Sequence, residues 1–194
     1  MAETLTTAGE VETKSAISVK VEEISLKRLG PLLDLAERER KAFDRVWGDK
    51  NLLRVKIPLF ERLFGSRGEN KSLRFGSADI GKETIFLLNF DAQKIESAQV
   101  ACLIREKEFV PLDIEEFFVL VALALSRKLE NNVSPGVLVV TFGEVWSTSG
   151  NTCFGGADSL VPCFSRDEKR QVTVSLESLK EPWTETCFFA CCRL

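Results

Sequence analysis

The chain has 194 residues, of which 44% are hydrophobic and 28% charged, a composition typical of a globular protein with one substantial core. It contains no His, which excludes Ser/His and Cys/His nucleophile pairs, His-ligated zinc and a proximal His for haem. The formal net charge is −3, so binding to a polyanion would have to be local and would not involve the whole surface.

The start of the chain and its apolar runs bear on where the protein resides. Residues 1–7 lack the basic and apolar regions of a secretory signal. The longest apolar run, Phe117–Leu125, has nine residues, against the roughly 18 to 20 that span a bilayer. We therefore expect an intracellular, cytoplasmic protein without a transmembrane segment, in which the six Cys residues are free thiols.

The first elements are an arm and a helix. Residues 1–20 are rich in Thr, Glu, Ala and Ser and have no apolar period, so we expect a disordered acidic arm over 1–20 and a single globular domain over 21–194. A helix is predicted over 31–47, because its apolar residues fall near one face, Pro31 suits the first turn and Gly48 suits the position after the end.

The period then changes to that of a strand. Apolar residues alternate with Arg54 and Lys56 over residues 53–57, which predicts a strand with one basic face. Further short strands are expected at 72–75, 84–90 and 98–104.

A second helix is predicted over 113–130. Asp113 can cap its first turn, Glu116 occupies the third helical position, and Arg127 and Lys128 suit the C-terminal end of the helix dipole. The apolar run inside it covers every side, so this helix should be buried almost all round. A buried strand is the competing interpretation, and length and capping favour the helix.

The remaining residues are expected to be strands separated by turns. The expected strands are 137–146, 159–164, 171–177 and 184–190, with a loop at 147–156. The sequence thus predicts an α+β domain, mainly an antiparallel β-sheet or sandwich with two covering helices at about 31–47 and 113–130.

The basic segment 49–74 is the strongest candidate binding surface. Seven Lys and Arg residues face three acids there, an excess of 7 − 3 = +4. Its candidate nucleic-acid-binding residues are Arg54, Lys56, Arg62, Arg67, Lys71 and Arg74. Such a face can neutralise phosphates, and Phe60, Phe64 and Phe75 can stack on unpaired bases. A solvated sheet face over core Phe residues is the simpler and favoured interpretation.

The order of elements between residues 52 and 146 is a further pattern in the sequence. An apolar strand followed by Asp91, a helix, and Pro135 leading into Leu138-Val-Val-Thr-Phe resembles the core of plant-virus cell-to-cell movement proteins. The resemblance implies binding of single-stranded RNA without sequence preference, at a membrane-associated channel between cells.

Three further features admit both a chemical and a structural interpretation. The thiols Cys187, Cys191 and Cys192 could bind zinc or mark a lipidation box, but a final strand with thiols as small apolar residues is favoured. The glycine-containing loop 147–156 is more typical of a turn than of a phosphate site. Asp91 and the pair Glu115 and Glu116 are better explained as turn and helix-start residues than as catalytic acids.

These patterns favour a non-enzymatic function. We expect no catalytic residue, no metal ligand and no cofactor, and the favoured role is a macromolecule-binding or scaffold protein whose partner is a protein or a single-stranded nucleic acid. A viral RNA-binding protein of the movement-protein type and a small Cys- or carboxylate-dependent enzyme are the alternatives. The sequence leaves the oligomeric state open.

Overall fold

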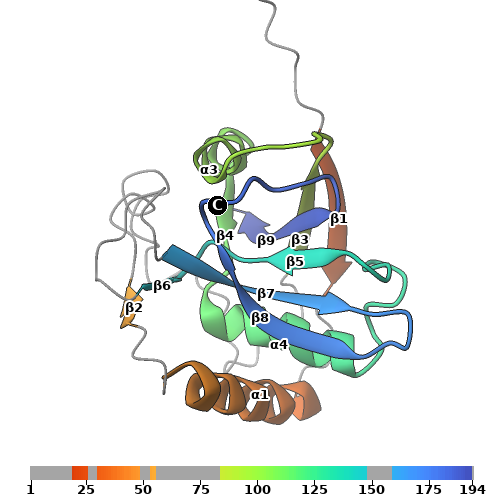
Figure 1. Ribbon diagram of the computed structural model, residues 1–194. Helices are drawn as coiled ribbons and strands as arrows, with labels where there is room; N and C mark the ends of the chain where they lie inside the picture. The colour runs from red at the N-terminus through yellow and green to blue at the C-terminus, as the bar shows by residue number, and fades with distance from the viewer. Residues whose placement is uncertain (1–18, 26–29, 49–52, 56–83, 148–158, 194) are drawn as a thin grey trace, which may run out of the picture.

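The computed structural model describes residues 19–25, 30–48, 53–55, 84–147 and 159–193 (Figure 1). These ranges hold three helices and a mixed, mostly antiparallel sheet, so the predicted α+β class is confirmed. The helices are α1 (Gly30–Gly48), α3 (Ser97–Glu106) and α4 (Ile114–Leu125). The strands are β1 (Val19–Ser25), β2 (Leu53–Val55), β3 (Thr84–Phe90), β4 (Phe109–Pro111), β5 (Leu138–Val140), β6 (Val145–Ser147), β7 (Ser159–Arg166), β8 (Val172–Ser178) and β9 (Cys187–Arg193).

The strands form one sheet in the order β1-β3-β9-β5-β7-β6-β2. β4 also pairs with β9, and β8 also pairs with β7. The pair β5 and β9 is parallel, and the other pairs of described strands are antiparallel.

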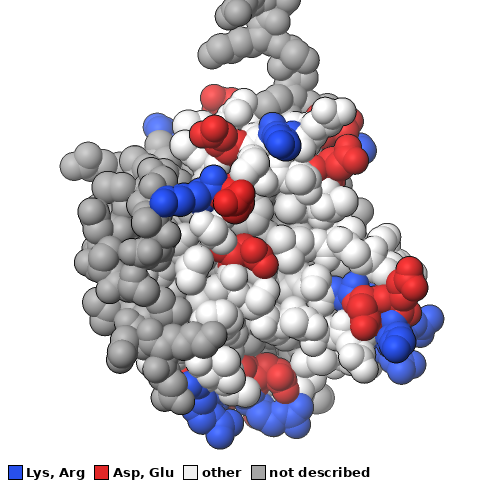
Figure 2. All heavy atoms as spheres, viewed as in Figure 1, with Lys and Arg blue, Asp and Glu red and all other residues white. Residues whose placement is uncertain are grey.

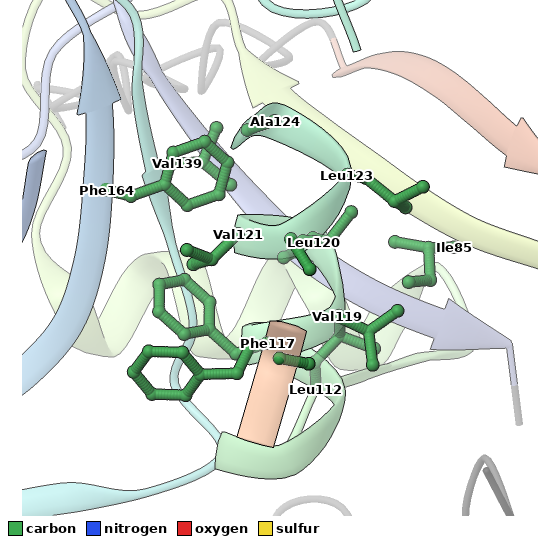
Figure 3. Close-up of a cluster of buried hydrophobic side chains, with 14 of the residues drawn as sticks. Ile85, Leu112, Phe117, Val119, Leu120, Val121, Leu123, Ala124, Val139 and Phe164 are labelled. Atoms are coloured by element: carbon green, nitrogen blue, oxygen red, sulfur yellow. The ribbon is translucent and has the colours of Figure 1, made fainter. Parts of the chain in front are cut away.

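Helix α4 lies between the sheet and α1, and these layers enclose the larger core (Figure 1). Figure 3 shows Leu123 of α4 beside Ile85 of β3, and Val121 on the opposite flank with Val139 and Phe164. Ten of the twelve residues of α4 are buried, namely Ile114 and Glu116–Ala124. The predicted all-round burial of this helix is therefore confirmed.

The start of α4 is a capping box. The Glu116 amide donates to Asp113 Oδ1 at 2.9 Å, and the Asp113 amide donates to Glu116 Oε2 at 2.8 Å. Two amides that the helix itself cannot satisfy thus find acceptors. The helix interpretation of this apolar run is confirmed, and the competing strand is wrong.

The helix ends five residues earlier than predicted, at Leu125. Arg127 adopts a left-handed conformation with φ 58°, and its amide donates to Ala124 O at 3.0 Å while the Lys128 amide donates to Leu123 O at 2.9 Å. These two bonds close a Schellman motif. Arg127 and Lys128 therefore lie just beyond the helix and not in its last turn.

A second core lies on the opposite face of the sheet, under α3 (Figure 1). The predicted strand at 98–104 is wrong, since these residues belong to α3. Its buried residues Ser97, Val100, Ala101 and Ile104 follow the spacing of a helix face. A short run with apolar residues in neighbouring positions fits either period until its partner surface is known. Besides the two predicted covering helices, the described residues thus contain a third helix, α3, which covers the opposite face of the sheet.

The predicted strand at 137–146 is divided into β5 and β6 by residues 141–144. Here the Thr141 hydroxyl donates to the Leu112 carbonyl, and the Gly143 amide donates to Thr141 Oγ1 at 3.2 Å. A Cβ atom on Gly143 would lie 2.7 Å from the carbonyl carbon of Leu112 and would overlap its oxygen. The strand is therefore interrupted at residues 141–144, where the backbone of Leu112, which leads into α4, passes next to Gly143.

The other boundaries differ by small amounts. β1 begins at Val19, inside the predicted N-terminal arm, and β9 begins at Cys187, three residues after its predicted start, because the Cys187 amide turns back to Thr184 O at 2.9 Å. The strand expected at 72–75 lies outside the described residues. No helix in the described part of the chain is long and apolar enough to cross a membrane.

Gly143→Ala should destabilise the protein, because the added methyl group meets backbone atoms that cannot rotate away. We expect the free energy of unfolding in a denaturant titration to fall by about 2–3 kcal/mol, as for an overpacked core. Gly48→Ala is the control, because a Cβ there meets nothing within 4 Å and Ala favours a helix over Gly by about 1 kcal/mol. Equal stability of Gly143→Ala and the unsubstituted protein would contradict this account of the break.

Candidate functional site

The predicted nucleic-acid-binding residues begin at one end of the sheet. Arg54 lies in β2, the last strand in the sheet order, and is opposite Trp146 of β6 in the register. Lys56, Arg62, Arg67, Lys71 and Arg74 lie outside the described residues. The structure therefore describes residues 53–55 of the basic segment, in β2, and a shared surface of the six basic side chains stays a prediction.

A groove of about 310 Å³ runs between α1 and α4. Its lining consists of Leu33, Ala36, Glu37 and Arg40 from α1 and Glu115, Phe118 and Val119 from α4. Phe118 and Val119 are buried and form an apolar floor, whereas Glu37 and Glu115 are exposed at the rim. Figure 2 shows acidic and basic side chains side by side where α1 forms the lower edge of the molecule.

The charges of the groove are paired along α1. Lys41 Nζ lies 2.7 Å from Glu37 Oε1, and Arg40 Nη1 lies 3.1 Å from Asp44 Oδ2. The hydrogen bond and the charge of Lys41 lower the pKa of Glu37, so this carboxylate stays ionised at neutral pH. The groove thus has an apolar floor and a charged rim, on which Glu37 and Arg40 are each paired with a neighbour one turn along α1 and Glu115 adds a further exposed carboxylate.

The carboxylates considered as catalytic acids are separated. Glu116 is buried in the capping box, while Glu115 points to solvent at the groove rim. Asp91 has a half-exposed side chain 3.9 Å from Lys20 Nζ, and the next residue, Ala92, turns back to Phe90 O at 2.7 Å. The helix-start and turn interpretations of these residues agree with this geometry.

Several buried polar side chains bond to the backbone of neighbouring segments. Asn89 donates to Glu185 O at 2.6 Å and to Cys187 O at 3.0 Å. Trp183 Nε1 donates to Ser97 Oγ at 2.8 Å, and that hydroxyl donates to Leu179 O at 2.8 Å. These bonds fasten the segment between β8 and β9 to β3 and α3, so the polar atoms serve the scaffold.

The thiols differ in their surroundings. Cys187, Cys191 and Cys192 are buried in β9, as the final-strand interpretation predicted. Cys163 of β7 is also buried, with its Sγ 3.1 Å from Ser175 Oγ, and burial raises its pKa to about 12. Cys102 on α3 is exposed. Across the described ranges, no group of three or more Cys, Asp or Glu residues could hold a metal ion.

The groove is the feature that the sequence analysis missed. In the helix predicted over 31–47, the charged residues Glu37, Arg38, Arg40 and Lys41 fall away from the apolar face and read as solvated, and the apolar run of α4 reads as core. The groove exists only because these two helices pack side by side, which neither local pattern specifies. The glycine-containing loop, apart from Ser147 at the end of β6, lies outside the described residues.

No protein-family model, curated protein or solved structure matches this chain.

The described thiols should react with iodoacetamide in a fixed order. Cys102 should be alkylated first because it is exposed, and Cys163 only upon unfolding, because it is buried and its pKa is about 12. Mass spectrometry of peptides, with a denatured sample as the control, measures this order. Alkylation of native Cys163 as fast as Cys102 would contradict this assignment.

The raised pKa of Cys163 also predicts a change of stability with pH. The free energy of unfolding should fall as the pH rises from about 8.5, the pKa of an unfolded Cys, towards the pKa of about 12 in the folded protein.

Proposed function

We propose that this chain is a non-enzymatic binding protein whose folded surface engages a macromolecule. The observation that carries the proposal is that four buried polar side chains form hydrogen bonds with neighbouring segments of the fold. These side chains are Asn89, Ser97, Glu116 and Trp183. The surface groove has an apolar floor and, at its rim, Glu37 and Arg40 in ion pairs along α1. Among the described residues, these features suit recognition by shape and charge more than bond-making chemistry.

Single-stranded RNA is the partner that the charge pattern favours. Residues 49–74 carry an excess of +4 on a chain whose net charge is −3, and this segment includes the terminal strand β2. Among the described strands, β2 has a neighbour on one side only, β6. The resemblance to plant-virus movement proteins supports the same partner, and a role in moving RNA between cells is part of this second proposal.

Fluorescence anisotropy with a labelled single-stranded RNA tests this partner. We expect weak binding that falls steeply as salt rises. Replacing Arg54, Lys56, Arg62 and Arg67 with Gln should flatten the dependence of log K on log salt by about 3, because each phosphate contact on a single strand contributes about 0.7.

The matched control removes four positive charges elsewhere. Arg38 and Arg45 in α1, Lys94 before α3 and Lys169 in the turn before β8 are exposed, and their replacement with Gln changes the net charge by the same amount. This control should keep the steep salt slope. Equal slopes in the unsubstituted protein and the first variant would exclude the basic segment as the RNA site.

The enzyme alternative makes a different prediction for the alkylation experiment. A Cys-dependent enzyme needs a thiol whose pKa is lowered and which therefore reacts far faster than free cysteine at pH 7. The binding proposal predicts that no thiol behaves in this way. One such thiol would favour the enzyme.

A further inference from the structure

Strand β8 has an edge that no described strand covers. It pairs over its full length with β7, from Val172 opposite Arg166 to Ser178 opposite Leu160. Its opposite edge has no partner among the strands that the structure describes. A free strand edge presents backbone donors and acceptors that can pair with another chain.

The hydrogen-bond pattern tells which groups face that edge. The Leu179 amide donates to Ser159 O at 2.9 Å, and the Asp167 amide donates to Gln171 O at 3.1 Å, both in the register of the pair. In an antiparallel pair, hydrogen-bonded and non-hydrogen-bonded positions alternate. Residues 173, 175 and 177 therefore bond to β7. The N–H and C=O groups of Val172, Val174, Leu176 and Ser178 point towards the free edge.

The other sheet edges are protected in ways that β8 is not. β1, which is equally long, carries Lys20, Glu22 and Glu23, whereas β8 carries only Glu177. β2 and β4 have three residues each. Charges and shortness are the usual means of preventing edge-to-edge pairing. Figure 2 shows mostly uncharged atoms over the part of the surface where β7 and β8 lie.

The apolar face of β8 is incompletely buried. Leu176 belongs to the core next to α4, while Val172 and Val174 pack against the same core and remain partly exposed. Within the described strands, the sheet ends beside these two side chains, at the free edge of β8. A further strand would cover both side chains without any change in the fold.

We propose that two copies of this chain pair antiparallel through their β8 edges and form a two-fold symmetric dimer. The outward-facing groups require an even-numbered residue opposite an even-numbered one. Pairing all seven residues then places Ser175 opposite Ser175 of the second copy, at the symmetry axis. Val174 lies opposite Leu176, and Glu177 lies opposite Thr173.

This register suits self-association in charge and in shape. The single carboxylate of each strand, Glu177, meets a neutral Thr173, so no like charges oppose each other within β8. The apolar residues Val174 and Leu176 meet on the side of the α4 core and extend it across the interface. Because the pairing uses the free edge of both copies, it closes at a dimer and does not propagate.

The dimer should be weak. Seven paired residues on each side compare with about 20–30 in a standard interface. We therefore expect a dissociation constant on the order of micromolar and a monomer–dimer equilibrium that depends on concentration.

Sedimentation velocity of the full chain over a concentration series tests the proposal with two substitutions at one exposed position. Thr173→Glu places a carboxylate opposite Glu177 of the second copy, twice per dimer, and should weaken dimerisation about tenfold, because like charges directly opposite each other destabilise a strand pair. Thr173→Lys places an ammonium group there and should preserve or tighten the dimer. Thr173 is exposed, so both variants should keep the fold, which circular dichroism checks.

A compensating pair tests the register itself. Thr173→Glu combined with Glu177→Lys restores opposite charges across the axis and should recover the dimer. Amide exchange should also slow with concentration at Val174 and Leu176, whose N–H groups face the free edge, and should stay unchanged at Ser175. A monomer at all concentrations, or a dimer equally stable in Thr173→Glu and Thr173→Lys, would overturn the proposal.

Discussion

The structure depends on one constraint: helix α4 is apolar on every side and must therefore be covered on every side. An ordinary surface helix buries one stripe and leaves the rest in water. Here the sheet covers one flank through residues such as Ile85, Val139 and Phe164, and α1 covers the other, with Phe43 against Phe118 at a ring separation of 5.4 Å. The position of α1 against α4, and with it the groove between the two helices, follows from this need.

The entry to α4 connects this constraint to the sheet. Leu112 donates its amide to Ala190 O of β9 at 3.0 Å and accepts from the Thr141 hydroxyl. Asp113 then begins the helix, and Gly143 lets the two backbones cross. Three segments that are distant in the sequence, around Leu112, Gly143 and Ala190, thus meet at the start of α4. The buried polar side chains of Asn89, Ser97, Glu116 and Trp183 likewise bond within the scaffold.

The sequence predicted those features whose signals are local. Asp113 and Glu116 predict a capping box, the apolar run after them predicts a buried helix, and the apolar residues Val172, Val174 and Leu176 alternate with polar ones, as is typical of a strand. The sequence did not predict the elements whose secondary structure depends on contacts with distant parts of the chain. Residues 98–104 belong to α3, whose buried face packs on the sheet. The predicted strand 137–146 is interrupted because the backbone of Leu112 passes next to Gly143.

In the candidate site, too, some features have a local signal in the sequence and others depend on distant contacts. The pairing of Glu37 with Lys41 is local, at a spacing of four along a helix. The groove beside them requires α1 to lie on α4, and the free edge of β8 requires the whole sheet order. Neither can be deduced from a window of sequence, because each is a property of the assembled layers.

Native-state hydrogen exchange of α4 tests the central claim most directly. If this helix is the centre of the fold, the amides of Leu120 to Ala124 should exchange only through global unfolding, with the full free energy and denaturant dependence of that transition. Exchange of these amides through a local opening as easy as that of the exposed turn at 167–170 would contradict the account.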